Sequence, residues 1–354
     1  MISFLRRNSS TLGLDIGSGF VKAALVEHGG PEPVVAKLAY TPLAPDAIVE
    51  GEVMDPQLVV DTVRALLTEL GLKAPRVVSA VGGRDVIVKR IPMDRMKAED
   101  AREVIRWEAE QYVPFDMANV QLDFQILDPG ADGLQMQVLL VAAKREVVDQ
   151  KLALLGEAGL TPSIVDVDAF ALMNAFAYNY PEAMQGVSAL VNVGHEVATV
   201  NVVQDGALVL TRDIPFGARQ LRENLRRLKG LTAEEAEAVI QGRSERQDEF
   251  LPLLTQGGEE LALGVERAVA FLSLGDAGSG IGRVYLSGGC AALPGLAAAL
   301  SERLHARTET ANPFQRLQLR PDAALLFPLD ELAPMLMLPV GLALRTTAYR
   351  PGLP

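Results

Sequence analysis

The sequence predicts an α/β fold of two halves that repeat one motif, with a small α/β subdomain inserted in the first half. The repeat is the main observation: an apolar strand, a Gly-containing turn and a second apolar strand occupy 12–26 and recur at 190–200. In this alignment Asn192 takes the place of Asp15, 177 residues away in a chain of 354. A segment of different rhythm, roughly 75–162, lies between the two copies.

The first half begins with two strands, not with a strand and a helix. Apolar runs flank the turn Asp15–Gly19, and no helical period follows its glycines. A phosphate loop of the P-loop or Rossmann kind must open a helix, so this turn instead joins antiparallel strands. We expect a third strand at 34–40, and a helix that begins at Asp55-Pro56 and ends at Gly71.

The remaining elements follow from periodicity and turn residues. In the inserted segment we expect strands at 77–81, 86–91, 121–127 and 135–142 and helices at 98–112 and 145–158. In the second half we expect a strand at 207–212, a helix at 220–229, a strand, Gly-Gly turn and helix over 284–305, and a short helix at 338–345, with 244–258 as a surface loop or weak helix. The predicted division is a first half of 1–76, 163–187 and 335–354, an inserted subdomain of 77–162, and a second half of 188–334.

Composition argues against several classes of function. The chain has 33 Lys and Arg against 45 Asp and Glu, a formal charge of −12, and such a surface repels the phosphate backbone of nucleic acids. With one cysteine, Cys290, and three histidines, a disulfide, a cysteine zinc site and a multi-histidine metal centre are not expected. We see neither about 18 uninterrupted apolar residues nor a secretory signal at 1–7, so we expect a cytoplasmic protein.

Three Gly-containing turns indicate a nucleotide clamp. Small residues in the first turn, Gly17, Ser18 and Gly19, and Gly194 in the second leave backbone N–H groups open to phosphate oxygens. Magnesium favours one or two carboxylates together with phosphates and waters. We therefore expect Asp15, beside the first turn, to face a hydrated Mg²⁺.

Further residues near these turns are candidates for the same ligand. Lys22 adds an ammonium group on the strand that follows the first turn. The third turn, Gly288-Gly289, would let adenine or ribose lie against bare backbone. His195 in the second turn has two readings that stay open, a polar turn residue and a phosphate contact through an imidazolium or one N–H.

With these turns in this order, the chain resembles the actin-like ATPases, a superfamily that includes actin, sugar kinases, heat-shock chaperones and FtsA. Their phosphate-1, connect-1, phosphate-2, adenosine and connect-2 elements are similar to 12–26, 164–176, 190–203, 284–296 and 337–345. The inserted subdomain resembles that of the FtsA-like branch. The resemblance implies ATP with Mg²⁺ as the ligand, and it adds Gly217 and Glu223 as cofactor-binding residues, Glu223 towards the ribose.

Five motifs resemble more narrowly the PilM family, the cytoplasmic actin-like components of bacterial type IV pilus machinery. They are 108–115, 164–172, 216–221, 312–314 and 340–345. This resemblance covers essentially the whole chain and implies a scaffold that binds ATP and docks the cytoplasmic N-terminal tail of the inner-membrane protein PilN beside the inserted subdomain. It also implies association with the inner membrane through partners and a link to assembly motors or regulators. Whether the chain forms a homo-oligomer or ring stays open.

The second turn departs from the superfamily at its catalytic position. Most actin-like ATPases carry aspartate where this chain has Asn192, whose amide cannot accept a proton. We therefore expect slow or absent ATP hydrolysis, with Asp168 or Glu196 as the residues able to substitute. Two alternatives remain. An FtsA-like cell-division ATPase usually ends in a basic amphipathic helix, which residues 346–354 of this chain, with two prolines, do not resemble. A small-molecule kinase of the same superfamily needs a second-substrate motif, and we find none.

Overall fold

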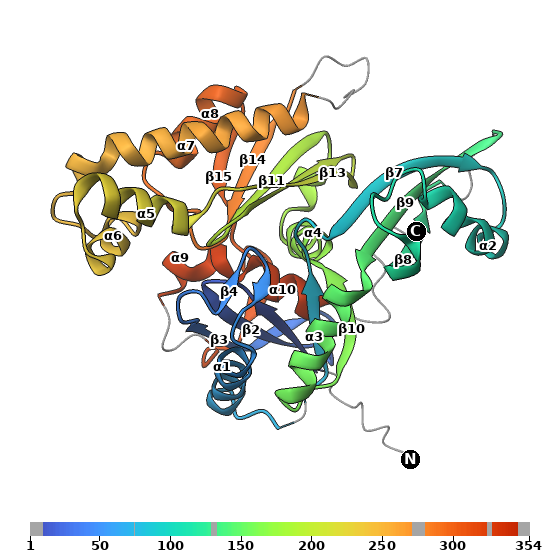
Figure 1. Ribbon diagram of the computed structural model, residues 1–354, viewed down its shortest axis with the longest axis horizontal. Coiled ribbons are helices and arrows are strands. Elements are labelled where there is room, and N and C mark those ends of the chain that lie inside the picture. The colour runs from blue at the N-terminus through green and yellow to red at the C-terminus, as the bar shows by residue number, and fades with distance from the viewer. Residues whose placement is uncertain (1–9, 74, 129–132, 271–279, 324–327, 346–354) are drawn as a thin grey trace.

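The computed structural model describes residues 10–73, 75–128, 133–270, 280–323 and 328–345, which form two lobes, each built on one mixed sheet (Figure 1). The first-lobe sheet has the order β10-β6-β1-β2-β3-β16, and the second-lobe sheet has the order β13-β12-β11-β14-β15. The first-lobe strands are β1 (Ser10–Ile16), β2 (Phe20–Glu27), β3 (Val34–Pro42), β6 (Val77–Val81), β10 (Pro162–Val167) and β16 (Gln318–Leu319). The second-lobe strands are β11 (Val187–Val193), β12 (Ala198–Gln204), β13 (Ala207–Ile214), β14 (Arg283–Ser287) and β15 (Arg307–Thr310).

The two sheets repeat one pairing pattern. In each lobe a hairpin pairs two antiparallel strands, β1 with β2 and β11 with β12, and a third strand, β3 or β13, continues the antiparallel side. The first strand of each hairpin also pairs in parallel with a later strand, β6 or β14, and that strand pairs in parallel with β10 or β15. The pattern confirms the predicted duplicated α/β fold.

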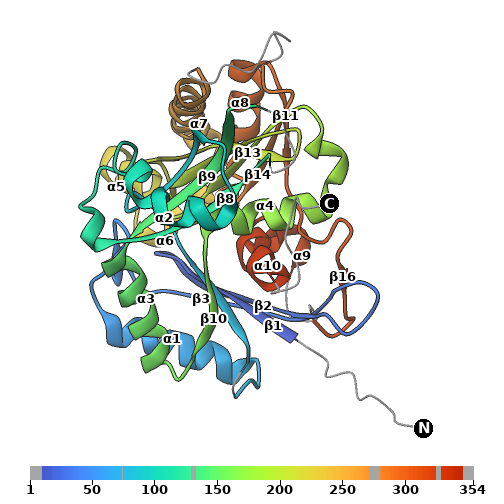
Figure 2. The same cartoon turned by 90° about the vertical axis from the view of Figure 1, so that its right-hand side faces the viewer.

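Helices on the first lobe cover both faces of its sheet. Helix α1 (Pro56–Glu69) begins as predicted, because Asp55 Oδ1 accepts a hydrogen bond from Leu58 N at 3.0 Å, and it packs with α3 (Arg145–Glu157) on one face. On the other face α4 (Asp168–Asn179) and α10 (Met337–Leu344) lie between the two sheets (Figure 2). Their apolar residues join side chains of both lobes in one core, which includes Phe176 and Tyr285.

The predicted inserted segment contains a separate three-stranded antiparallel sheet that projects from the first lobe (Figure 1). Its order is β7 (Val86–Asp94), β9 (Gln135–Lys144), β8 (Val120–Ile126), and α2 (Ala98–Ala109) packs on one face through a core that includes Ile105 and Leu140. β6, at the start of that segment, pairs with β1 and β10 in the first-lobe sheet. The division of the chain into three units stays a prediction.

Helices of the second lobe agree with the sequence except over 244–258. Helix α5 (Ala218–Lys229) ends at Gly230 with φ +70°, and α6 (Ala233–Ile240) starts with a capping box at Thr232. In place of a loop or weak helix, α7 (Gln247–Val269) runs for 23 residues and its buried face packs on α5 and α8 (Leu296–Leu304). Gly257 and Gly258 make this possible, because they lie directly against Leu221 and Ala299.

Smaller elements complete the described chain: the hairpin β4 (Ile48–Val49) and β5 (Glu52–Val53), the helix α9 (Leu329–Leu332), and three 3₁₀ turns at Met117–Asn119, Pro181–Met184 and Ala333–Leu336. Within the described residues no helix is long and apolar enough to cross a membrane. The N-terminal segment 1–7 and the tail 346–354, on which two expectations rested, lie outside the described residues.

Candidate functional site

The ends of neighbouring first-lobe strands bring the predicted polar residues together. β1, β6 and β10 are parallel neighbours, so their carboxyl ends meet at one edge of the sheet, where open α/β sheets bind their ligands. Asp15 lies near the end of β1, Gly82 directly follows β6, and Asp168 directly follows β10. A Cβ built on Gly82 would lie 2.2 Å from Asp168 Oδ2, so glycine is required to leave room for this carboxylate.

The second lobe repeats this arrangement with β11 and β14. Near the end of β11, Asn192 Oδ1 accepts a hydrogen bond from Ser287 Oγ at 3.1 Å, and Ser287 ends β14. Gly288 has φ +90°, and a Cβ there would lie 2.3 Å from Val193 O, so both its backbone and its contact require glycine. A Cβ on Gly289 would meet nothing within 4 Å, which leaves its backbone approachable.

The two hairpin turns lie against each other across the lobes. A Cβ on Gly19 would lie 3.0 Å from His195 Cβ, and one on Gly217 would lie 2.5 Å from His195 O. Burial, followed by the nearby charge of Arg222, lowers the pKa of His195. The imidazole is therefore neutral at pH 7, which favours the reading of His195 as a polar turn residue.

Both turns present unused hydrogen-bond donors. Gly17 N and Gly194 N close their own turns by donating to Phe20 O and Val197 O, each at 3.0 Å. Within the described residues, four other backbone N–H groups of these turns make no hydrogen bond: those of Ser18, Gly19, His195 and Glu196. Successive N–H groups on small turn residues form the kind of concavity that binds phosphate.

Charged side chains gather on the first-lobe side of the site. Lys22 Nζ lies 2.5 Å from Asp15 Oδ2, and both side chains are at most 15% exposed. Burial, then the charge of Asp15, raises the pKa of Asp168 to about 7, against the opposing charge of Lys151 on α3. Burial in turn lowers the pKa of Lys151. A carboxyl group that titrates near neutrality beside Asp15 has the property that general acid–base chemistry requires.

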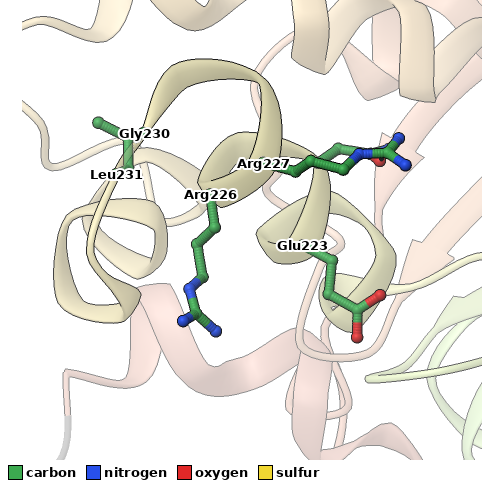
Figure 3. Close-up of a pocket in the computed structure, with 6 residues that line it drawn as sticks. Glu223, Arg226, Arg227, Gly230 and Leu231 are labelled. Atoms are coloured by element: carbon green, nitrogen blue, oxygen red, sulfur yellow. Dashed lines mark hydrogen bonds between the residues drawn. The ribbon is translucent and has the colours of Figure 1, made fainter.

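A pocket leads away from the second turn along helix α5. Its volume is about 710 Å³, and His195, Arg219, Glu223 and Arg226 line it together with Asp46 of the first lobe. An adjoining pocket of about 490 Å³ shares Glu223 and Arg226 (Figure 3). The second turn and the predicted ribose residue Glu223 thus border one continuous space.

The predicted residues fit a nucleotide better than they fit a bare metal ion. The unused N–H groups, Lys22 and the glycine contacts suit phosphates, and the α5 pocket is large enough for a nucleoside. No group of three or more His, Cys, Asp or Glu side chains positioned to hold a metal occurs among the described residues. A magnesium ion here would take ligands from phosphates and waters with Asp15 as its nearby carboxylate, as magnesium in phosphate sites does.

Three residues of the site were missed at the sequence level. Lys151 lies in the middle of α3, and in the sequence a single lysine within a helix indicates a solvated side chain. Asp213 lies near the end of β13, accepts a hydrogen bond from Thr199 Oγ1 at 2.8 Å, and its pKa is raised by burial. Arg226 lines both pockets, and its guanidinium makes no hydrogen bond or ion pair with the described residues. Their positions depend on contacts between distant segments, for which the sequence carries no local signal.

Comparisons with known proteins identify the family of the chain. A family model described as type IV pilus assembly protein PilM matches residues 13–347. The solved PilM–PilN type IV pilus biogenesis complex is similar to the chain at 30% identity and a TM-score of 0.82, over 94% of this chain and 97% of the other.

Two further solved structures share the actin-like ATPase fold. The ethanolamine utilization protein EutJ from Carboxydothermus hydrogenoformans has 18% identity and a TM-score of 0.56, over 95% of this chain and 89% of the other. MreB5 of Spiroplasma citri bound to ADP has 12% identity and a TM-score of 0.54, over 94% of each chain. At these identities the likeness concerns the fold alone.

Proposed function

The chain belongs to the type IV pilus assembly protein PilM family, and from that premise we propose that it is a scaffold that binds ATP with Mg²⁺ between its lobes and docks the cytoplasmic N-terminal tail of PilN. The observation that carries the nucleotide proposal is the pair of facing turns, whose unused N–H groups lie beside the Lys22–Asp15 pair. The α5 pocket extends from His195 in this arrangement to Glu223, where a ribose would bind. The similar MreB5 structure holds ADP, which supports a nucleotide as the ligand class.

Each part of the site then has a distinct task. The N–H groups of Ser18, Gly19 and His195 donate to phosphate oxygens, and Lys22 neutralises their charge. When bound, Mg²⁺ supplies further charge neutralisation of the phosphates, with Asp15 orienting its waters. Asp168, on the same first-lobe side as Asp15, holds or accepts a proton, whereas Asn192 of the second lobe only donates and accepts hydrogen bonds.

The nucleotide proposal is tested by calorimetry with MgATP. Asp15→Ala removes the carboxylate and leaves Lys22 without its partner, so we expect at least a roughly tenfold weaker affinity, about 1.4 kcal/mol. Asp61→Ala is the matched control, because Asp61 pairs with Arg64 on the exposed face of α1. Equal affinities of the wild type and Asp15→Ala would contradict the assignment.

The tail of PilN is proposed to dock where the inserted sheet meets the first lobe. The face of that sheet away from α2 carries Val88 and Val141, which are half-buried and pack against the first-lobe core beside Phe170 and Met173 of α4. These four half-buried apolar side chains, from β7, β9 and α4, offer an anchor for an apolar peptide residue. The similar PilM–PilN complex supports the partner. In a second docking mode the peptide adds as a strand to β8, because β8 pairs only with β9 among the described strands and leaves its other edge open.

A synthetic PilN tail peptide distinguishes these modes. Val88→Lys places a charge on the proposed surface and is expected to weaken peptide binding at least roughly tenfold, while MgATP binding stays near the wild-type value. Because Val88 packs against the first-lobe core, the thermal midpoint is measured to confirm that the variant is folded. Leu134→Lys is the control, because Leu134 lies in the same segment and is 91% exposed. Cross-links of the peptide to β8 would favour strand addition, and cross-links confined to residues after Val187 would refute docking at the inserted segment.

The wider role follows from the family. We propose that partners hold the chain at the inner membrane and that, through PilN, it links the assembly platform to the motors. A pull-down of motor proteins by wild-type protein and by Val88→Lys, each with and without ATP, tests this link. Motors recovered only when the peptide surface is intact would support the proposal, and recovery independent of both peptide and nucleotide would contradict it.

A further inference from the structure

A short segment of the first lobe crosses to the second lobe at the edge of the α5 pocket. This segment, the strap, comprises residues 43–54 and contains the hairpin β4–β5. Asp46 Oδ1 of the strap lies 3.0 Å from Arg219 Nη2, and Glu50 N donates to Glu196 Oε2 at 2.9 Å. Arg219 and Glu196 both belong to the second lobe, so the two contacts join the lobes directly.

The second-lobe end of these contacts is itself ordered by ion pairs. Arg219 Nη1 lies 2.6 Å from Glu196 Oε1 and Arg219 Nε lies 3.2 Å from Glu223 Oε1. The Glu196 side chain is only 11% exposed, and both of its oxygens are engaged. Hydrogen bonds from Arg219 to Glu196 and Glu223 therefore tie the strap contacts to the residue that faces the proposed ribose.

The strap is anchored in the first lobe at its start and through its buried residues. Leu43 N donates to Gly19 O at 3.0 Å, so the strap begins on the first phosphate turn. Ala47 is buried, and its carbonyl accepts from Met54 N at 2.9 Å. Arg84 lies 3.5 Å from Glu50 Oε2, which holds the hairpin tip from the side of the inserted segment. Because the strap is fixed to the first lobe, separation of the lobes must break its contacts with Arg219 and Glu196.

The backbone of the strap is unusual at its two contact residues. Asp46 has φ +63° and Glu50 has φ +51°, the left-handed region that residues other than glycine rarely adopt. Asp tolerates this region better than most residues, whereas Glu does not. For Glu50 the cause is local, because Glu50 and Gly51 (φ +85°) form the two-residue turn of the β4–β5 hairpin, which requires a positive φ at both positions. The unusual backbone of Asp46 occurs where its side chain reaches Arg219 of the second lobe.

We propose that the strap is a latch: Asp46 and Glu50 hold the two lobes closed over a nucleotide and slow its release. The proposal rests on the proposed function, since it requires a nucleotide in the α5 pocket that Asp46 and Arg219 line. The Asp46–Arg219 pair is exposed on one side, with side-chain exposures of 70% and 33%, so it is a weak and salt-sensitive contact that opens readily.

Stopped-flow release of a fluorescent ATP analogue from the full chain, chased with excess MgATP, tests the latch. Asp46→Asn removes the charge and keeps a residue that tolerates the left-handed backbone, and we expect release roughly two- to fivefold faster than from the wild type. Release from the wild type is expected to accelerate between about 50 mM and about 500 mM salt, and release from Asp46→Asn to change less.

Asp205→Asn is the matched control. Asp205 also has a left-handed backbone, φ +48°, in an exposed turn, and its side chain accepts from Gly186 N far from the strap contacts. Equal release rates for Asp46→Asn, Asp205→Asn and wild type would overturn the latch while leaving nucleotide binding established. Complete loss of binding by a folded Asp46→Asn would also overturn it, because Asp46 would then be a ligand contact. A wild type that does not bind the analogue would refute the proposed function, and the latch with it.

Discussion

Substitution of Gly341 by alanine tests the closest packing in the core between the lobes. Helix α10 lies so near α4 that a Cβ on Gly341 would be 1.7 Å from Ala171 O and 2.6 Å from Ala171 C, whereas an ordinary contact needs at least 3.4 Å. The obstacle is backbone, which cannot rotate away as a side chain can. The same helix packs on β1, where a Cβ on Gly13 would be 2.0 Å from Pro339 O, so α10 cannot retreat towards the sheet either.

We therefore expect Gly341→Ala to lower the free energy of unfolding by about 3 kcal/mol or more, at the upper end of the range for overpacked cores. The thermal midpoint should fall by roughly 6–12 °C, given roughly 2–4 °C per kcal/mol for a large domain. Gly156→Ala is the control: Gly156 lies in α3, and a Cβ there meets nothing within 4 Å. That variant should be stabilised by about 0.5–1 kcal/mol through helix propensity. Equal midpoints for the two variants in calorimetric scans would refute the inferred backbone contact.

Two further predictions concern the proton on Asp168 and the rate of ATP hydrolysis. Because the pKa of Asp168 is raised from 3.8 to about 7, the native state alone keeps this proton between those pH values, and the wild type loses stability as pH rises towards 7. Urea denaturation without nucleotide should thus show that Asp168→Asn has a free energy of unfolding about 2–4 kcal/mol above that of the wild type at pH 8, and little above it at pH 4.5. An equal difference at both pH values would contradict the raised pKa of this buried carboxyl group. Purified wild type should hydrolyse fewer than roughly one ATP per minute, well below the usual range for enzymes, and Asn192→Asp should raise phosphate release, since it restores a carboxylate 3.1 Å from Ser287 Oγ. Rapid turnover by the wild type, or no change in Asn192→Asp, would count against the role given to this position.

The sequence alone revealed the duplication and the site turns because both depend on local pattern. A strand, a small-residue turn and a second strand can be read within about a dozen residues, and Asp15 and Asn192 occupy equivalent positions of antiparallel hairpins as predicted. Helix ends were equally local: Asp55 caps α1, and Gly230 ends α5 with its left-handed backbone. The family resemblance, confirmed over residues 13–347, rested on such short motifs.

Helix α7 shows where local reading fails. Its glycines and Pro252 lower helix propensity, so 244–258 reads as a loop or weak helix. In the fold, Gly257 and Gly258 allow α7 to lie against Leu221 and Ala299, and burial of a long apolar face outweighs the poor propensity. The deciding partners come from other elements, which no window of the sequence contains.

Tertiary structure alone decided how the site residues act on one another. The residue types at Asp15, Asp168 and His195 were evident, but a pKa of about 7 for Asp168 arises only because burial and the Asp15 carboxylate are brought to it by neighbouring parallel strands. Three other segments join the site, α3 with Lys151, β13 with Asp213, and the strap with Asp46 and Glu50. The contact between Asp46 and Arg219 spans 173 positions of the chain. Propensity and pattern act between near neighbours in the chain, whereas electrostatic and packing energies depend on distance in space, so the sequence determined the parts of this protein and the fold determined their coupling.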